Sequence, residues 1–253
     1  MRTRIVYEDR EILIACKPAG LPVQTAKIGL ADMVSELKNY LAKSEAENGN
    51  RKKGAAAGRE ARNHQPYLGV VHRLDQPVEG LLVFAKTRQA AAALTKQLAS
   101  GTLHKRYAAV VCGKPSQKEG MLVDYLYKDA NNTARILQEG DAHYAEAKRA
   151  VLHYSLMKTV SKESDGAVQE LSLLDITIET GRFHQIRAQM ANAGMALMGD
   201  AKYAGEKVKQ FSRQLGITSV ALCACKISLK HPVTGEELCF ETEPQGKAFS
   251  YFD

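Results

Sequence analysis

The chain has 253 residues, of which 45% are hydrophobic and 25% are charged, a composition typical of a globular protein with one large domain or two modest ones. Its five cysteines are odd in number and scattered, which excludes a disulfide-stabilised scaffold. No apolar stretch approaches the length of a membrane span, and the first residues lack the apolar core of a signal peptide. We therefore expect a cytoplasmic protein without a membrane partner.

The chain is basic, with a formal net charge of +7 at pH 7 and a pI of about 9.1. Two interpretations fit this charge equally well. The excess Lys and Arg either keep the protein soluble or contact the phosphates of a nucleic acid, whose counterions are released on binding. Charge alone permits RNA as a partner and does not identify it.

The first quarter of the chain predicts a strand, a helix and a loop. Residues 12–16 form a short apolar run that stops at Lys17-Pro18-Ala19-Gly20, as expected of a buried strand. Between residues 28 and 41 apolar side chains recur at three- and four-residue steps, which predicts an amphipathic helix. Residues 43–65 contain no large apolar side chain and predict a flexible basic loop, whose cations are better explained as solvated than as RNA contacts.

The rest of the chain predicts many strands and few helices. Strands are expected at residues 68–72, 81–85, 106–112, 121–127, 145–157, 171–179, 219–229 and 237–242, with a polar loop at 160–167. Thr87 predicts the N-cap of a helix that ends at Gly101. A second helix is expected to open at Thr180 and to end near Gly194. This pattern predicts a single α+β domain over residues 1–253, with largely antiparallel strands.

The first candidate site is His72-Arg73-Leu74-Asp75, which lies between two predicted strands. Pro77 and Gly80 enforce a turn after it, so the Asp75 carboxylate would be held in a defined direction on a rigid scaffold. Taken alone, an aspartate before a turn more often caps that turn, with Arg73 as its surface partner.

The second candidate is Thr180-Gly181-Arg182-Phe183-His184-Gln185-Ile186-Arg187. On a helix, His184 and Arg187 share one face, and the planar guanidinium of Arg187 can hold a distant carboxylate and lower its pKa. A solvated polar face explains the pattern equally well. No second ligand lies at metal-binding spacing from His184, so a metal site is not expected.

The third candidate is Lys105-Arg106-Tyr107, at the start of a predicted strand. An aromatic ring beside cations suits stacking on an unpaired base next to a phosphate. Taken alone, a tyrosine at a strand start is more often a packing residue.

In the order in which they occur, these blocks resemble the RluA-type RNA pseudouridine synthases. The matching blocks are Lys17-Pro18-Ala19-Gly20, His72-Arg73-Leu74-Asp75 with Gly80-Leu81-Leu82, Lys105-Arg106-Tyr107, Thr180 to Arg187, Gly199-Asp200-Ala201-Lys202-Tyr203 and His231-Pro232-Val233-Thr234-Gly235. They span nearly the whole chain except residues 43–65, and six ordered blocks are far more specific than any one of them. The resemblance implies the pseudouridine synthase fold, in which a mixed, largely antiparallel sheet forms two half-domains around a catalytic cleft.

The resemblance also implies roles for individual residues. Asp75 would be the catalytic aspartate, Arg187 its ion-pair partner and Tyr107 the ring that stacks on the target base. Arg73 would enter the RNA helix where the uridine leaves it. The other substrate-binding residues would be His72, Lys105, Arg182, His184 and Gln185. The reaction breaks the N1–C1′ glycosidic bond, rotates the detached uracil and rejoins it through C5, with neither a metal nor an organic cofactor.

Five positions depart from the family pattern, among them Gln189-Met190 in place of a usual His-Leu pair. Val78-Glu79 stands where relatives usually carry Thr-Ser, and Phe183 replaces a usual threonine. These changes leave the activity in place and put the substrate specificity in question. Because there is no room upstream of Lys17 for an S4-like RNA-binding domain, we expect a stand-alone catalytic domain. We also expect a monomer.

The predicted partner is structured RNA, and family analogy favours ribosomal RNA over transfer RNA. Two other functions stay open. One is a catalytically silent RNA-binding protein, in which the change at Val78-Glu79 has disabled the site. The other is a hydrolase of glycosidic bonds, which typically needs two carboxylates, and no block offers a second one.

Overall fold

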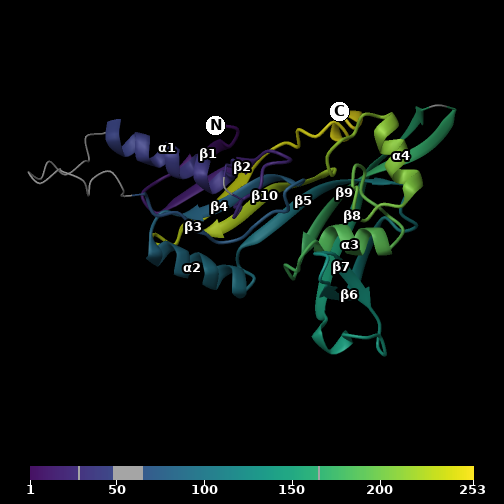
Figure 1. The fold of residues 1–253 in the computed structure, drawn as a ribbon, viewed down its shortest axis with the longest axis horizontal. Coiled ribbons are helices and arrows are strands. Elements are labelled where there is room, and N and C mark those ends of the chain that lie inside the picture. Colours follow the sequence, from purple (N-terminus) through teal and green to yellow (C-terminus); the bar gives the residue numbers. More distant parts are fainter. Residues whose placement is uncertain (28, 48–64, 165) are drawn as a thin grey trace, which may run out of the picture.

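The structure, a computed structural model, describes residues 1–27, 29–47, 65–164 and 166–253. Over these residues eleven strands form one sheet, and four α-helices lie on it (Figure 1). The strands are β1 (Arg4–Glu8), β2 (Ile12–Lys17), β3 (Gly69–Val70), β4 (Glu79–Ala85), β5 (His104–Cys112), β6 (Glu119–Lys128), β7 (Ala134–Leu137), β8 (Lys148–Ser164), β9 (Ala167–Ile178), β10 (Leu222–Lys230) and β11 (Glu237–Glu241). The helices are α1 (Met33–Glu47), α2 (Arg88–Ala99), α3 (Gln185–Asn192) and α4 (Glu206–Gln214). Within the described ranges, no helix is both long and apolar enough to pass through a membrane.

The strand order in the sheet is β1-β2-β4-β10-β5-β9-β8-β6-β7, with β3 paired to β4 and β11 paired to β10. The pair β4–β10 is parallel, and the other strand pairs of the described chain are antiparallel. The predicted fold class, α+β with a mixed and largely antiparallel sheet, is therefore confirmed.

Helices α1 and α4 lie on one face of the sheet and α2 and α3 lie on the other, above and below it in Figure 1. Successive side chains of a strand point to opposite faces, so Leu82 packs toward α1 while Val83 packs toward α2. In β5, Tyr107 packs toward α3 and Val110 toward α4. The segment between β3 and β4 connects the two lower clusters, because Val71 packs with the cluster of α2 and Val78 with that of α3.

Helix α1 begins five residues later than predicted. The Asp32 carboxylate accepts hydrogen bonds from the backbone N–H groups of Ser35 (2.7 Å) and Thr25 (2.9 Å), which caps the helix at Asp32 and leaves Leu30 outside it, 57% exposed. The helix also continues to Glu47, so the loop prediction was wrong for residues 43–47. The greater part of that predicted loop, residues 48–64, lies outside the described residues.

The polar loop predicted at residues 160–167 was also wrong. Strand β8 continues to Ser164, β9 starts at Ala167, and the two strands pair up to Ser164 and Ala167. Polar side chains are compatible with this ribbon because each strand satisfies the other's backbone groups. Strands β1 and β7 and helix α4 were not predicted.

The unusual pair Val78-Glu79 serves the fold of this chain. Val78 is 2% exposed and packs in the cluster that contains Tyr107. Glu79 is 7% exposed, and its Oε1 accepts hydrogen bonds from the backbone N–H groups of Gln245 (3.0 Å) and Gly246 (2.9 Å). Glu79 therefore ties the C-terminal segment to β4.

Replacing Glu79 by alanine leaves two partly buried N–H groups without their acceptor. We expect the free energy of unfolding to fall by about 1–3 kcal/mol, measured by urea denaturation. The matched control is Glu237→Ala on β11, where the side chain is 85% exposed, and a change within about 0.5 kcal/mol is expected. Equal stabilities of the two variants would contradict the assignment.

Candidate active site

The side chains of Asp75 and Arg187 meet although 112 positions separate them in the chain. The Nη1 group of Arg187 donates a hydrogen bond to Asp75 Oδ2 at 3.1 Å. The Arg187 side chain is 6% exposed and that of Asp75 is 24% exposed, so the pair sits between the core and solvent. The ion pair implied by the resemblance is present, and its catalytic role stays a prediction.

The rest of the Arg187 guanidinium binds Asp200. Its Nε and Nη2 donate to Asp200 Oδ2 and Oδ1, both at 2.8 Å, and Asp200 is 1% exposed. Asp200 also accepts hydrogen bonds from the backbone N–H groups of Lys202 (2.9 Å) and Tyr203 (3.1 Å). Burial opposes ionisation of Asp200, but the hydrogen bonds and charge of Arg187 outweigh burial and hold its pKa below the usual value. The bidentate pair fixes the guanidinium plane and leaves Nη1 for Asp75.

Asp200 is the second carboxylate that sequence reasoning missed. It stands in the block Gly199-Asp200-Ala201-Lys202-Tyr203, which was used only to identify the resemblance. Contact with Arg187 depends on the tertiary fold, and the only signal in the sequence was the position of an aspartate inside a matching block.

His184 lies beside the ion pair without completing it. Its Nδ1 is 2.7 Å from Tyr203 Oη, while its Nε2 is 3.6 Å from Asp75 Oδ2, which is too long for a hydrogen bond. Burial lowers the pKa of His184 to about 4, although the charge of Asp75 opposes this shift. The imidazole is therefore neutral at pH 7.

Gln185 holds the turn that opens α3. Its Oε1 accepts hydrogen bonds from Thr180 Oγ1 (2.8 Å) and the Arg182 N–H (3.0 Å), and its Nε2 donates to the Val151 carbonyl at 3.0 Å. This turn explains why α3 begins at Gln185 and not at Thr180 as predicted. Gln185 is 3% exposed and bonded to its own chain, and its predicted contact with substrate stays a prediction.

Tyr107 lies on β5, 4% exposed, in the same apolar cluster as Val78. Burial raises the pKa of Tyr107, and the charge of Asp75 raises it further, so the phenol stays protonated. Lys105, two residues earlier, faces the same side of β5 and is partly buried, which lowers its pKa. Both residues thus lie on the sheet face that carries α2 and α3.

His72 is buried at the turn between β3 and β4. Its Nε2 accepts a hydrogen bond from the Val83 N–H at 3.3 Å, and its Nδ1 is buried without a hydrogen-bond partner among the described residues. Burial lowers the pKa of His72 to about 3, and the charge of Lys105 adds to the shift. His72 is therefore a neutral residue of the scaffold, and its predicted contact with substrate stays a prediction.

Two of the predicted cations are exposed. Arg73 makes no hydrogen bond or ion pair with any described residue, so the alternative in which it pairs with Asp75 on the surface is wrong. Arg182 is exposed, and its Nε donates to the Arg149 carbonyl at 3.1 Å. Both side chains are accessible to an anionic partner.

Lys17 is a second residue whose role was missed. It is fully buried, and its Nζ donates to the carbonyl groups of Pro18 (3.1 Å), Leu21 (2.8 Å) and Gln76 (2.9 Å). Burial lowers its pKa to about 8, although the charges of Asp75 and Glu79 oppose this. Lys17 thereby anchors the residue that follows Asp75.

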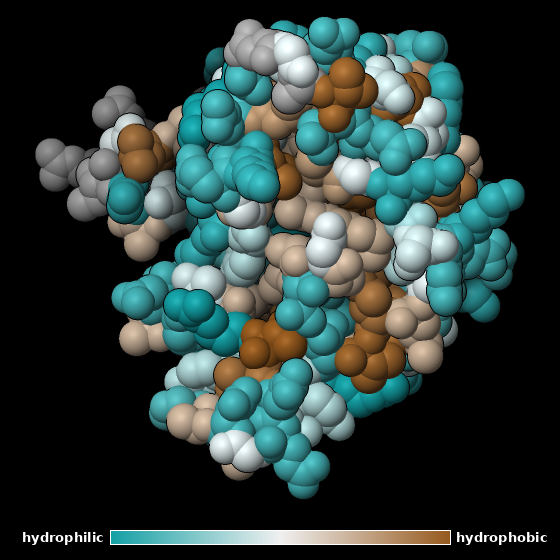
Figure 2. Space-filling model, turned by 90° about the vertical axis from the view of Figure 1, so that its right-hand side faces the viewer, coloured by the Kyte–Doolittle hydropathy of each residue, from teal (hydrophilic) through white to brown (hydrophobic). Residues whose placement is uncertain are grey.

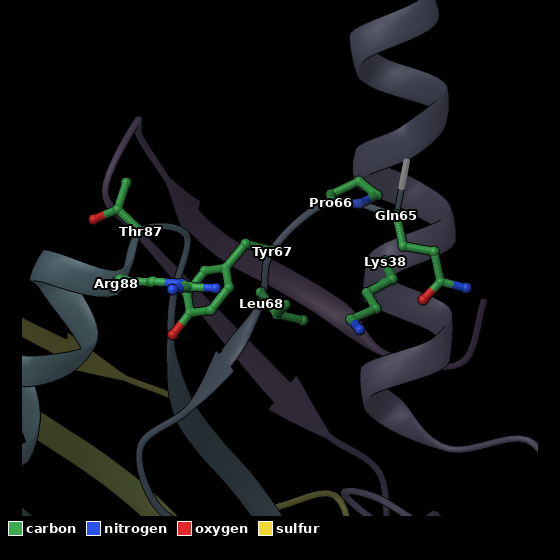
Figure 3. Close-up of a pocket in the computed structure, with 7 residues that line it drawn as sticks. All are labelled: Lys38, Gln65, Pro66, Tyr67, Leu68, Thr87 and Arg88. Carbon is green, nitrogen blue, oxygen red and sulfur yellow. The ribbon is translucent and has the colours of Figure 1, made fainter. Parts of the chain in front are cut away.

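A pocket of about 500 Å³ lies between α1 and the start of α2, lined by residues that include Lys38, Tyr67 and Arg88 (Figure 3). Its lining contains none of the candidate site residues, so the cleft predicted around Asp75 stays a prediction. Within the described ranges, no cluster of three or more His, Cys, Asp or Glu side chains could hold a metal ion.

The buried histidines predict loss of stability in mild acid. An unfolded histidine binds its proton near pH 6.5, whereas folded His72 does so only near pH 3, so stability falls as the pH drops below about 6.5. From pH 7 to pH 5 we expect His72 alone to account for about 2 kcal/mol of the fall in unfolding free energy. In His72→Gln, whose amide oxygen can still accept the Val83 N–H, that part should vanish in urea denaturation series. His104→Gln, at the exposed start of β5, is the control; an unchanged pH dependence in His72→Gln would refute the assignment.

Comparisons with known proteins agree with the resemblance. The sequence profile of the RNA pseudouridylate synthase family matches residues 11–192. Over 242 residues the chain is 32% identical to ribosomal large subunit pseudouridine synthase D of Zymomonas mobilis, covering 94% of this chain and 68% of that protein. Over 238 residues it is 34% identical to the uncharacterized RNA pseudouridine synthase YhcT of Bacillus subtilis, covering 94% of this chain and 67% of that protein.

Solved structures show the same fold. Human RNA pseudouridylate synthase domain containing 1 matches with a TM-score of 0.71 at 17% identity, over 96% of this chain and 83% of that one. Human RNA pseudouridylate synthase domain containing 4 matches with a TM-score of 0.66 at 19% identity, over 98% and 92%. Taken with the profile and the relatives, these similarities show that the chain belongs to the RNA pseudouridylate synthase family, whose members are isomerases.

Proposed function

We propose that this chain isomerises uridine to pseudouridine in structured ribosomal RNA and that Asp75 is the catalytic carboxylate. The observation that carries the proposal is the buried Arg187, which is locked on Asp200 and presents Nη1 to Asp75. The arginine stabilises the negative charge of Asp75 at Oδ2, while no described group hydrogen-bonds to Oδ1. A carboxylate oxygen held in this way is ready to attack or deprotonate a nucleoside.

The reaction needs the uridine outside its helix. Extrusion of a base costs a few kcal/mol, which phosphate contacts of a basic protein can offset. Arg73 and Arg182 are exposed and suited to those contacts, and Lys105 is suited to the same role from its partly buried place. Tyr107 would hold the extruded uracil by stacking while the N1–C1′ bond breaks and the C5–C1′ bond forms. C5 then loses its proton to solvent, and N1, freed from C1′, takes up a proton, so that the product is an isomer of uridine.

The choice of ribosomal RNA rests on the relatives. Several are named ribosomal large subunit pseudouridine synthase D, from Zymomonas mobilis, Neisseria meningitidis and Pasteurella multocida. Transfer RNA is the alternative substrate, and mapping pseudouridine in RNA from cells without the gene would separate the two.

The two rival functions are less well supported. A hydrolase would need a second accessible carboxylate, but Asp200 is 1% exposed and bonded to Arg187 and two backbone N–H groups. A silent RNA-binding protein would need a disabled site. Val78 packs in an apolar cluster and Glu79 accepts hydrogen bonds from the C-terminal segment, and the Asp75–Arg187 pair is formed beside them.

The molecular context is part of the same proposal. One sheet running through all described strands supports a single catalytic domain, and we expect it to act as a monomer. The five cysteines are free thiols, which supports a reducing compartment such as the cytoplasm.

Replacing Asp75 by asparagine keeps its shape and removes its charge. We expect pseudouridine formation to fall by at least about 10²–10⁴-fold, because the reacting carboxylate is gone. The measurement is tritium release from RNA labelled with [5-³H]uridine, with RNA affinity measured in parallel and expected to stay within about threefold. Asp253→Asn, exposed at the C-terminus, is the control. Full activity of Asp75→Asn would remove Asp75 from the mechanism.

Replacing Asp200 by asparagine tests positioning. An asparagine amide cannot accept both hydrogen bonds from Nε and Nη2 of Arg187, as the Asp200 carboxylate does. The guanidinium is then no longer held in one orientation, and Nη1 no longer points steadily at Asp75. We expect kcat to fall about 10- to 100-fold with KM within about threefold, since Asp200 is too buried to touch RNA. Circular dichroism and thermal unfolding check that the variant folds. A folded variant with unchanged kcat, or with KM alone affected, would rule out this role.

A further inference from the structure

The end of the molecule that carries β6, β8, β9, α3 and α4 exposes apolar side chains among hydrophilic ones (Figure 2). Large exposed apolar residues on these elements and the loop before α3 are Met121, Val123, Tyr125, Met157, Val168 and Phe183. Among them, Phe183 contacts His184, which lies beside Asp75.

The imidazole of His184 separates the Phe183 ring from the Asp75 carboxylate. The Phe183 ring stacks on the His184 imidazole with centroids 3.8 Å apart and planes 19° apart. His184 in turn lies 3.6 Å from Asp75 Oδ2 and is held from its other nitrogen by Tyr203. The Phe183 ring is 36% exposed and belongs to none of the buried apolar clusters in the described ranges. It is therefore a flat apolar surface held in a fixed orientation at the edge of the site.

A cation lies over the same ring. The ammonium group of Lys128, an exposed residue at the end of β6, is 4.7 Å from the centroid of Phe183. An exposed contact of this kind is worth only about two- to fivefold in an equilibrium constant. Stacking of a nucleobase on an aromatic side chain is worth about 5- to 150-fold in an equilibrium constant. A base can thus displace the ammonium from the ring.

We propose that Phe183 and Lys128 form a binding subsite for an unpaired nucleobase that neighbours the target uridine. The base stacks on the Phe183 ring, and Lys128 moves from the ring to the adjoining phosphate. The inference rests on the proposed function, because it takes the uridine to be bound at Asp75. The Phe183 ring then contributes to recognition of the RNA. An RNA in which the base next to the target uridine is unpaired is bound more tightly than one in which that base is paired.

The matched variants are Phe183→Thr, which removes the ring, and Phe183→Tyr, which keeps it. The RNAs are fragments of large-subunit ribosomal RNA. In Phe183→Thr, we expect the Kd for these fragments, and the KM for the fragment that contains the target uridine, to rise about 5- to 50-fold. The kcat should stay within about threefold of the wild-type value. Phe183→Tyr should stay within about twofold. Tyr125→Thr is the control, because Tyr125 is 38% exposed on the same strand as Lys128 but faces the other side of β6 from the residues that contact α3.

A base-removal experiment separates stacking from support of His184. Each nucleotide next to the target uridine is replaced in turn by an abasic one. At one of these positions, the loss of the base should weaken RNA binding by the wild-type protein as much as Phe183→Thr does. At that position, the same abasic RNA should bind Phe183→Thr no more weakly than the intact RNA does. Lys128→Met should make the slope of log K against log salt concentration less steep by about one. Additive losses at every position, an unchanged Kd in Phe183→Thr, or a fall in kcat alone would overturn the subsite.

Failure of the proposed function gives a different result. In that case wild-type protein releases no tritium from any cellular RNA. The Kd comparison of Phe183→Thr, Phe183→Tyr and wild type still decides whether the ring binds RNA.

Discussion

The site depends on one guanidinium shared by two carboxylates. Arg187 is buried, and a buried charge is tolerated only when it is paired and hydrogen-bonded. Asp200 supplies the inner partner and is itself held by backbone N–H groups, so the guanidinium has a single orientation. Asp75 is the outer partner and meets only Nη1. The inner pair therefore sets the direction of the outer one, and the Asp75 carboxylate is placed by a buried ion pair.

Two clamps hold the elements that bring this pair together. On the Arg187 side, Gln185 fastens the turn before α3 to β8 through Val151. On the Asp75 side, Lys17 at the end of β2 fastens the next residue, Gln76, by its carbonyl group. Each clamp uses a buried polar side chain with its hydrogen bonds supplied by backbone groups, which makes the geometry rigid before any RNA binds.

The sequence predicted the parts of this arrangement that repeat a local pattern. Alternating and apolar runs predicted most strands, Thr87 predicted the cap of α2, and the ordered blocks predicted that Asp75 and Arg187 would meet. It could not predict contacts that only the tertiary fold creates. A buried lysine such as Lys17 contradicts the usual preference of that residue, and its three carbonyl partners become visible only in the folded chain. The polar ends of β8 and β9 gave no apolar signal, because the two strands pair mainly with each other there.

The place of β10 in the sheet has a consequence for the synthesis of the protein. This strand comes late in the chain, yet it lies between β4, which follows the Asp75 loop, and β5, which carries Tyr107. Until residues 222–230 have left the ribosome, β4 and β5 lack the strand that lies between them in the finished sheet. The sheet that carries the Asp75 loop and Tyr107 is therefore completed only late in synthesis, because its closure waits for a strand that is distant in sequence.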